Sequence, residues 1–506
     1  MIARVRVASL AFIALPGALV AQGLDPSPAS QCGAKNTVTP LAESAGDSRV
    51  LIRFTSDVSS TADEAIFARA LGTLTADRIR QAVDVDVRSR GLNGSSGNSS
   101  GDASSAVAEG RVLGVRFVLV GTVQSIDDRY LVSYRLVDAR SGKEMTNGSI
   151  SQPVVAVDSL VGAMTSTLTR AFGKPTYRPP PQDRIETTSP TALLAYLRAL
   201  TTVETFDRAR LAEAEQLLRE AIQEDPRFTA ARFRLADVLL RQLDWVEQRD
   251  RERVRLVRDG LWNVGFALLR DPYSTRALSL LGRLHLHGAA PHLTQHVVVA
   301  LERLAPGTAD AVTLSAQMER ALGKDSVALS GVRALAAATE RSPAALAVRA
   351  DLERRVGDPV VACRVLNRAV ALDPLFAPAY VWRAVVRSGL GERREAWADA
   401  EVASRLGRAD WGELTGALID LSMRDTVRAK NRLQAHMGGE SLSQAGWLDL
   451  LLRAGVAHGL QKPALAQQAL RLVPCSDPRR PQLEREPLLK FLKVPTECSG
   501  QRVAVR

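Results

Sequence analysis

The sequence has few of the residues that usually build catalytic and metal sites. Among its 506 residues there are six histidines and four cysteines, and only 5% are aromatic. It contains no GxSxG, HExxH or GxxxxGK(S/T) motif, the spacings that a nucleophilic serine, a zinc-binding helix and a phosphate-binding loop require. We therefore expect a protein that is not an enzyme and that holds no cofactor.

Long apolar segments are also missing, except at the start of the chain. Arg4 and Arg6 precede an apolar run over 7–20, and mostly small residues occupy 18–21. A basic start, a short apolar centre and a small-residue exit are typical of a secretory signal peptide. We predict a signal peptide over 1–21, cleaved after Ala21, and a disordered segment over 22–47. The mature chain is then expected to be periplasmic or secreted with no stable membrane span, and an uncleaved N-terminal anchor is the alternative.

The charge is strongly basic, but no part of the chain concentrates it. Lys and Arg number 66 against 55 Asp and Glu, which gives a net charge of +11. A nucleic-acid-binding protein gathers its basic residues in a patch or stripe, whereas these arginines are spread along the chain. We interpret the excess as arginine on solvated helix faces and expect no nucleic-acid partner.

The four cysteines allow three disulfide pairings, and sequence alone does not choose among them. Cys475 and Cys498 bracket a Pro-rich C-terminal tail over 475–506, and a bridge between them would hold a segment with little core of its own. We predict that bridge. Cys363 falls inside a helical pattern and is predicted to be a buried small residue. Cys32 has no evident partner, and the spacing of the four is not that of a zinc site.

A stretch over 213–226, EAEQLLREAIQEDP, recurs in modified form along the chain. Most copies pair two small residues seven positions apart, and most end in a proline, which stops a helix. The residues that we assign to packing between repeats are Ala214, Ala221, Pro226, Ala362, Ala369, Pro374, Ala396 and Ala403. The first copies end 46, 34, 37 and 31 residues apart, at Pro226, Pro272, Pro306, Pro343 and Pro374. A period near 34 is the length of a helix–turn–helix repeat.

On these residues the region 191–474 resembles the tetratricopeptide repeat family. The resemblance implies helix pairs that stack into an α-solenoid, because one pair cannot cover its own apolar face. It also implies a concave groove that binds a protein or peptide partner. Val381, Val385 and Ser388 share a face of a first helix and are our candidates for the lining of that groove.

The region before the repeats has a different pattern. Short apolar or alternating runs at 48–54, 83–90, 115–123, 132–136 and 143–150 predict strands, and turns are expected at Asp127 and Gly142. Thr61 and Glu64 have the spacing of a capping box, which opens a helix that we expect to run to Ala82. The predicted order over 48–172 is β-α-β-α-β-β-β-α, an α/β sandwich with a mixed sheet. A Pro-rich linker over 173–190 is predicted to separate it from the repeats.

Residues 113–115 and 118–121, with Asp138 and Gly142, make this first region similar to the N-terminal domain of the Tol-system protein TolB and to FlgO-like domains. The resemblance implies a partner-binding or sensory module. The expected fold class is therefore α+β: a small N-terminal α/β sandwich domain followed by an all-α tetratricopeptide-repeat superhelix.

Three functions remain open from the sequence. We expect an exported, non-enzymatic scaffold or adaptor that binds a protein or peptide partner, in cell-envelope signalling or assembly. A cytoplasmic or membrane-anchored signalling or regulatory protein is the alternative. A metal-dependent hydrolase is a third reading, because four of the six histidines lie close together, at His285, His287, His292 and His296.

Overall fold

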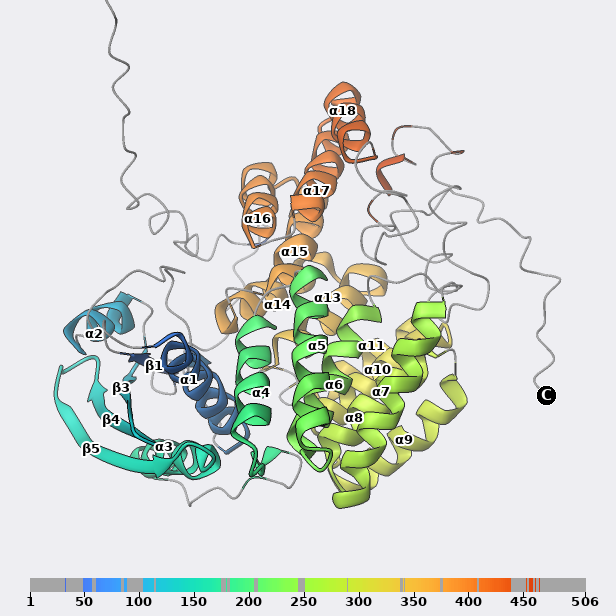
Figure 1. The fold of residues 1–506 in the computed structure, drawn as a ribbon. Helices are drawn as coiled ribbons and strands as arrows, with labels where there is room; N and C mark the ends of the chain where they lie inside the picture. Colours follow the sequence, from blue (N-terminus) through green and yellow to red (C-terminus); the bar gives the residue numbers. More distant parts are fainter. Residues whose placement is uncertain are drawn as a thin grey trace, which may run out of the picture.

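The computed structural model of the chain is mostly helical, with one small sheet near the beginning (Figure 1). It describes Cys32 and residues 49–437, with gaps at 57–60, 83–85, 89–102, 113–114, 174–178, 180–182, 204–207, 244–250, 289, 337–339, 341, 374–375 and 407–408. Beyond these it describes only 452, 455–457, 460 and 464. The predicted signal peptide and the tail over 475–506 therefore lie outside the described residues, as does Pro374. Within the described part, no helix is both long enough and apolar enough to cross a membrane.

The sheet has five strands in the order β2-β1-β3-β4-β5. The strands are β1 (Arg49–Ser56), β2 (Asp86–Arg88), β3 (Phe117–Ile126), β4 (Arg129–Asp138) and β5 (Glu144–Pro153). β1 runs parallel to both of its neighbours, whereas β3, β4 and β5 form an antiparallel meander. The turns of the meander contain Asp127 and Gly142, whose φ angles are 56° and 72°. The mixed sheet and the two turns predicted from the sequence are thereby confirmed.

Three helices belong to the sheet: α1 (Ala62–Ala82), α2 (Ala103–Val112) and α3 (Val157–Ala171). α1 and α3 pack on one face in a core that includes Phe67 and Leu160, and α2 covers part of the other face around Val118. The predicted capping box is present, since the Thr61 N–H donates to Glu64 Oε2 at 3.1 Å and the Glu64 N–H donates to Thr61 Oγ1 at 3.3 Å. The element order predicted for this region is also confirmed.

From residue 190 the chain forms consecutive hairpins of two helices. The hairpins are α4 (Pro190–Thr202) with α5 (Arg208–Glu224), α6 (Thr229–Gln242) with α7 (Arg251–Arg270), α8 (Thr275–His287) with α9 (Pro291–Leu304), α10 (Ala309–Ala321) with α11 (Asp325–Ala334), α13 (Pro343–Val356) with α14 (Pro359–Leu372), α15 (Ala377–Leu390) with α16 (Arg393–Arg405), and α17 (Ala409–Ser422) with α18 (Thr426–Met437). From α6 onward, the first helix of each hairpin also contacts the first helix of the next. This is the helical-repeat arrangement that the period near 34 predicted.

Small residues lie where the helices of the repeats approach one another. Ala214, Ala221, Ala362 and Ala369 are all fully buried, and so are Ala396 and Ala403. Pro226 lies two residues beyond the end of α5 and is exposed, which fits its place in the turn to α6. At Gly260 and Gly282 an added Cβ would come within 2.8 Å of a Leu284 methyl carbon and 2.5 Å of a Leu314 methyl carbon, so these leucine side chains lie directly over the two glycines.

The sheet region and the first repeats share one hydrophobic core, with α1 lying between the sheet and α4 (Figure 1). Ile185, in the segment predicted to be a linker, is 2% exposed within that core. Its N–H donates to Asp158 Oδ1 at 3.1 Å, and Thr187 Oγ1 donates to Asp225 at 2.7 Å. The described end of the segment, 183–189, is therefore packed and does not act as a solvated spacer, because its apolar and hydroxyl side chains find partners on both sides.

Candidate functional site: a groove and a disulfide on the second helices

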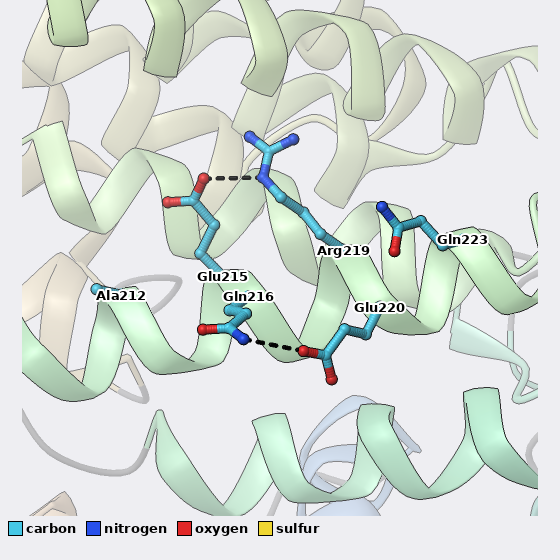
Figure 2. A pocket seen from close by; sticks show the side chains of 6 residues that line it. All are labelled: Ala212, Glu215, Gln216, Arg219, Glu220 and Gln223. Atoms are coloured by element: carbon cyan, nitrogen blue, oxygen red, sulfur yellow. Dashed lines mark hydrogen bonds and ion pairs between the residues drawn. The ribbon is translucent and has the colours of Figure 1, made fainter.

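One open depression on the described repeats follows the second helix of the first hairpin. It has a volume of about 400 Å³ and is lined by one side of α5, at residues Ala212, Glu215, Gln216, Arg219, Glu220 and Gln223. Their spacing of three or four residues places them on a single helix face. Figure 2 shows the side chains in a row, with Glu215 directed to Arg219 and Gln216 to Glu220. We call this surface, with its extension described below, the α5–α7 groove.

Ion pairs connect the two second helices that form the α5–α7 groove. Glu215 accepts from Arg219 at 2.9 Å and from Arg255 of α7 at 2.7 Å. Arg219 in turn lies 2.7 Å from Asp259 of α7. Burial alone would raise the pKa of Glu215, but hydrogen bonds from Arg255 and Arg219 outweigh it and hold the pKa below its usual value. The base of the groove is therefore a fixed row of charges at neutral pH.

The groove continues into a second depression of about 270 Å³ at the junction of α5, α6 and α7. Ile222, Leu235 and Trp262 supply apolar surface there. Trp262 is 72% exposed, which is unusual for so large a side chain. Arg232 donates to Asn263 Oδ1 at 3.3 Å and its guanidinium stacks 4.4 Å from the Phe266 ring. This end of the groove combines an apolar surface with a polar rim, a combination suited to holding one side chain of a bound polypeptide.

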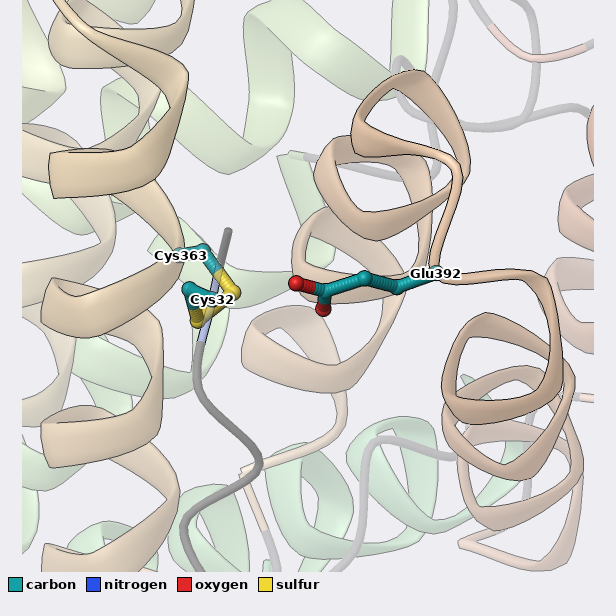
Figure 3. Close-up of side chains that lie close together, drawn as sticks. All are labelled: Cys32, Cys363 and Glu392. Atoms are coloured by element: carbon teal, nitrogen blue, oxygen red, sulfur yellow. A yellow bond between two sulfur atoms is a disulfide. The ribbon is translucent and has the colours of Figure 1, made fainter. Parts of the chain in front are cut away.

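A second contact, between α14 and the residue before α16, involves a residue from the beginning of the chain. Cys32 forms a disulfide with Cys363 of α14 across 331 positions of sequence, and both residues are buried. The Asn367 side-chain N–H donates to Cys32 Sγ at 3.3 Å. Figure 3 shows the carboxylate of Glu392, the residue that precedes α16, directed toward the disulfide. We call this contact the α14–α16 site.

The disulfide corrects two expectations. Cys363 is buried, as the helical pattern indicated, but it is bonded and is not merely a small core residue, and Cys32 does have a partner. No local pattern marks this pair, since only the folded repeats bring position 363 next to position 32. The predicted bridge between Cys475 and Cys498 lies outside the described residues and stays a prediction.

Sulfur and carboxylate atoms of Cys32, Cys363 and Glu392 lie within 4.8 Å of one another. They are the one grouping in the described part of the chain with the spacing of metal ligands. Two sulfurs joined in a disulfide are not thiolates and do not bind a metal as thiolates do.

The histidines do not form a comparable group. His292 and His296 are exposed, and His287 Nδ1 lies 3.3 Å from Arg253, whose side chain also donates to the His287 carbonyl at 3.1 Å. Burial and the proximity of His292 lower the pKa of His285. Within the described residues, these side chains therefore do not converge on a common ligand position.

The three residues of α15 that we predicted to line a groove, Val381, Val385 and Ser388, are buried or half-buried. Val381 is fully buried, Ser388 is 9% exposed, and Val385 is half-buried against the same core. Helical spacing placed them together on one face, but α15 packs against α13, α14, α16 and α17, and Val381 and Val385 belong to the core that these helices share. A first-helix face covered by neighbouring helices cannot receive a partner.

The sheet region itself occupies the first-helix side of the early repeats. Arg234 of α6 pairs with Asp77 of α1 at 3.3 Å, and Arg276 of α8 pairs with Asp183 at 2.5 Å. Arg78 of α1 donates to the backbone carbonyl of Asp183 at 3.2 Å. These contacts leave the second-helix side, where the α5–α7 groove lies, as the accessible surface of the first two repeats.

No protein-family model matches the chain, and no curated protein matches it. Among solved structures, it is similar to a human IFIT1 dimer with m7Gppp-AAAA, at 13% identity and a TM-score of 0.40, over 63% of this chain and 76% of that one. It is also similar to YrrB, described as a TPR protein with an unusual peptide-binding site, at 15% identity and a TM-score of 0.24, over 37% and 91%. TolB from Acinetobacter baumannii matches 25% of this chain and 28% of its own, at 12% identity and a TM-score of 0.19. Similarity at this level carries no information about what the chain binds.

Proposed function

We propose that the protein is an exported, non-enzymatic scaffold that binds a protein or peptide partner on its helical repeats. The observation that carries the proposal is the stack of helix hairpins with an open groove on its second-helix side. Stacked hairpins expose long, regular surfaces, and their usual use is to hold another polypeptide. In this proposal the partner occupies the repeats and the sheet region is fixed to them as one body.

Two further features support binding in preference to catalysis. Glu215 and Asp259 at the base of the α5–α7 groove are paired with Arg219 and Arg255, so these two carboxylates are held ionised and are not poised for proton transfer. An exposed tryptophan at the edge of a groove is the type of residue that dominates binding energy when a partner covers it.

Export is the second part of the proposal. The basic and apolar start of the sequence supports it, and a disulfide between Cys32 and Cys363 is the form expected in an oxidising compartment. The TolB-like and FlgO-like character of the sheet region belongs to the same proposal, as a partner-binding or sensory module of the cell envelope. A cytoplasmic or membrane-anchored regulatory protein is the competing reading, and fractionation of cells that express a C-terminally tagged chain decides between them.

The partner is best sought by photocrosslinking in the native cell. A photoreactive amino acid at Gln216 in the α5–α7 groove should give a discrete crosslinked species, and the same group at exposed Val427 of α18 provides the control. We expect the captured protein, once purified, to bind the full chain at a one-to-one ratio. If no described surface yields a crosslink and the purified chain turns over a small substrate, the scaffold proposal is wrong.

A further inference from the structure

We propose that Cys32, Cys363 and Glu392 form a binding site for Zn²⁺ once a dithiol has reduced the Cys32–Cys363 disulfide. In the disulfide state the two sulfurs are bonded to each other, and after reduction they supply two thiolate ligands beside a carboxylate ligand. The inference goes beyond the scaffold function and does not depend on it. It gives the α14–α16 site a second state.

The three ligand atoms are already close together. Both sulfurs and a carboxylate oxygen of Glu392 lie within 4.8 Å of one another, and Figure 3 shows the carboxylate directed toward the sulfurs. Around a tetrahedral zinc ion, with bonds of about 2.3 Å to sulfur and about 2.0 Å to oxygen, the ligand atoms are roughly 3.5 Å apart. A small separation of the sulfurs, once their bond is broken, therefore makes room for the ion.

The fold holds the carboxylate in place independently of the disulfide. Glu392 follows Gly391, whose φ of 83° ends α15. The Glu392 N–H donates to the Arg387 carbonyl at 2.9 Å, and the Glu392 carbonyl accepts from the Ala396 N–H at 3.0 Å at the start of α16. Cys363 is fully buried in α14, which packs on α15. The turn and the helix therefore keep these two ligands near each other whether or not the sulfurs are joined.

The charges around the site match a divalent cation. Arg383 and Arg387 both pair with Asp399, and Arg387 Nε lies 3.6 Å from Glu392 Oε2. Among these four side chains, two cations already balance two carboxylates. Two thiolates would add two negative charges, which the two positive charges of Zn²⁺ offset. A divalent cation therefore leaves this partly buried group of charges neutral.

Asn367 supplies the outer contact that metal-binding sulfurs usually have. Its side-chain N–H donates to Cys32 Sγ at 3.3 Å, and its Oδ1 accepts from Arg383 at 3.0 Å, which fixes the orientation of the amide. Such partners orient a ligand and tune its metal binding. Three protein ligands leave a fourth position for water, as in open zinc sites, and the Glu392 side chain is 17% exposed.

The two chemical steps balance. The dithiol supplies two electrons and two protons, which convert the disulfide into the thiols of Cys32 and Cys363, and the dithiol itself becomes a disulfide. Zn²⁺ then replaces the two thiol protons, which pass to solvent. Residue 32 is thus linked to α14 by a covalent bond under oxidising conditions and by a metal ion under reducing conditions.

Cobalt titration of the full-length protein tests the site, because Co²⁺ substitutes for zinc and its absorption bands report thiolate ligands and tetrahedral geometry. The protein is reduced with dithiothreitol, which is then removed by gel filtration without oxygen. Reduced protein should bind about one equivalent of Co²⁺ with a thiolate-to-cobalt charge-transfer band, and Zn²⁺ should displace it. Protein that has not been reduced should show no such band.

Cysteine variants identify the thiolates. Cys32→Ser and Cys363→Ser should each weaken cobalt binding at least about a hundredfold, because one thiolate ligand is lost. A protein that carries both Cys475→Ser and Cys498→Ser is the control, and its reduced form should keep the charge-transfer band and the affinity of the wild type.

A matched pair of glutamate variants tests the third ligand. Glu392→Gln should weaken cobalt binding at least about tenfold. Glu401→Gln is the control, since Glu401 lies on α16 but its side chain is 69% exposed, and it should leave the affinity unchanged. Circular dichroism and thermal melting verify that each variant folds.

Absence of the charge-transfer band in reduced wild-type protein would overturn the proposal. So would a loss of helical circular dichroism on reduction that Zn²⁺ does not reverse, because the site requires the folded repeats. Equal cobalt affinities of Glu392→Gln and Glu401→Gln would also contradict it. The photocrosslink at Gln216 is measured separately, so the zinc site and the scaffold function can fail independently.

Discussion

The guanidinium of Arg234 on α6 lies 3.3 Å from the carboxylate of Asp77 on α1, although 157 positions of sequence separate the two residues. This ion pair joins the second repeat to the main helix of the sheet region. Burial alone would raise the pKa of Asp77, but Arg234, Arg80 and Arg276 outweigh it and hold the pKa below its usual value. The contact shows that the sheet region is fixed to the repeats by charge as well as by shared apolar core.

We predict that Asp77→Asn lowers the free energy of unfolding by about 1–2 kcal/mol, because Arg234 loses its closest charged partner in a partly buried site. Arg234 is 18% exposed and Asp77 31% exposed, so solvent screens part of the interaction. Urea denaturation followed by circular dichroism measures the change.

The control for that prediction is another ion pair between α1 and the repeats, this time with α4. Arg198 and Asp63 lie 2.8 Å apart, but they are 45% and 47% exposed. Asp63→Asn should cost less than about 0.5 kcal/mol, because solvent-exposed pairs contribute little. If both variants lose the same stability, burial of the Arg234–Asp77 pair has no energetic role.

Lowering the pH should destabilise the protein, because carboxylates that the fold keeps ionised must then take up protons. Burial opposes ionisation of Asp351, but Arg320, Arg354 and Arg355 outweigh it and lower the pKa of Asp351 to about 2. The unfolded chain takes up this proton near pH 3.9, so the stabilisation is complete above about pH 5 and is lost as the pH falls toward 2. Asp351→Asn should therefore cost about 2 kcal/mol at neutral pH, and most of that cost should be lost by pH 2. A cost that does not change with pH would contradict this.

Asp310 should behave in the opposite way. Its burial raises its pKa, and the attraction of Arg276 and Arg283 does not compensate. At neutral pH the ionised Asp310 therefore lowers the stability of the folded state. Below the pKa that Asp310 has in the unfolded chain, the carboxyl group is protonated in both states and this loss of stability disappears. We expect Asp310→Asn to raise the unfolding temperature at pH 7 and to have little effect at pH 3. Thermal melts at the two pH values measure the difference.

The Cys32–Cys363 disulfide should be detectable in the native protein and should stabilise it by about 2–5 kcal/mol, since it closes a very long loop. Peptide mapping without reductant should recover one crosslinked fragment that contains both residues. Reductant should lower the unfolding temperature of the wild-type chain and leave Cys32→Ser unchanged. Equal sensitivity of the two proteins would show that another bridge carries the effect.

The contact between α16 and α17 requires a residue without a side chain at Gly412. A Cβ there would lie 2.8 Å from the Ala400 carbonyl oxygen and 2.5 Å from Ser404 Cβ. Gly412→Ala should cost about 1–3 kcal/mol, because two helix backbones must separate. Gly162 in α3 is the matched control, since an added Cβ meets nothing within 4 Å, and Gly162→Ala should stabilise the protein by about 0.5–1 kcal/mol. Loss of stability in both variants would mean that close packing is not the cause.

The sequence by itself determined the elements that depend on local order. Alternating apolar residues and the Asp127 and Gly142 turns gave the meander, the Thr61–Glu64 capping box placed the start of α1, and small residues seven apart located the second helices. These features follow from periodicity and turn chemistry, which act over a few residues and leave a mark in the sequence.

Only the tertiary structure decided what depends on distant residues. It brought Cys32 to Cys363, packed Ile185 into the shared core, and turned Val381 and Ser388 away from solvent. It also showed that the open groove lies between second helices, at Glu220 and Trp262. A helical pattern shows that a face is apolar or polar, but which neighbour covers that face depends on how the hairpins stack, and contacts across hundreds of residues leave no local pattern.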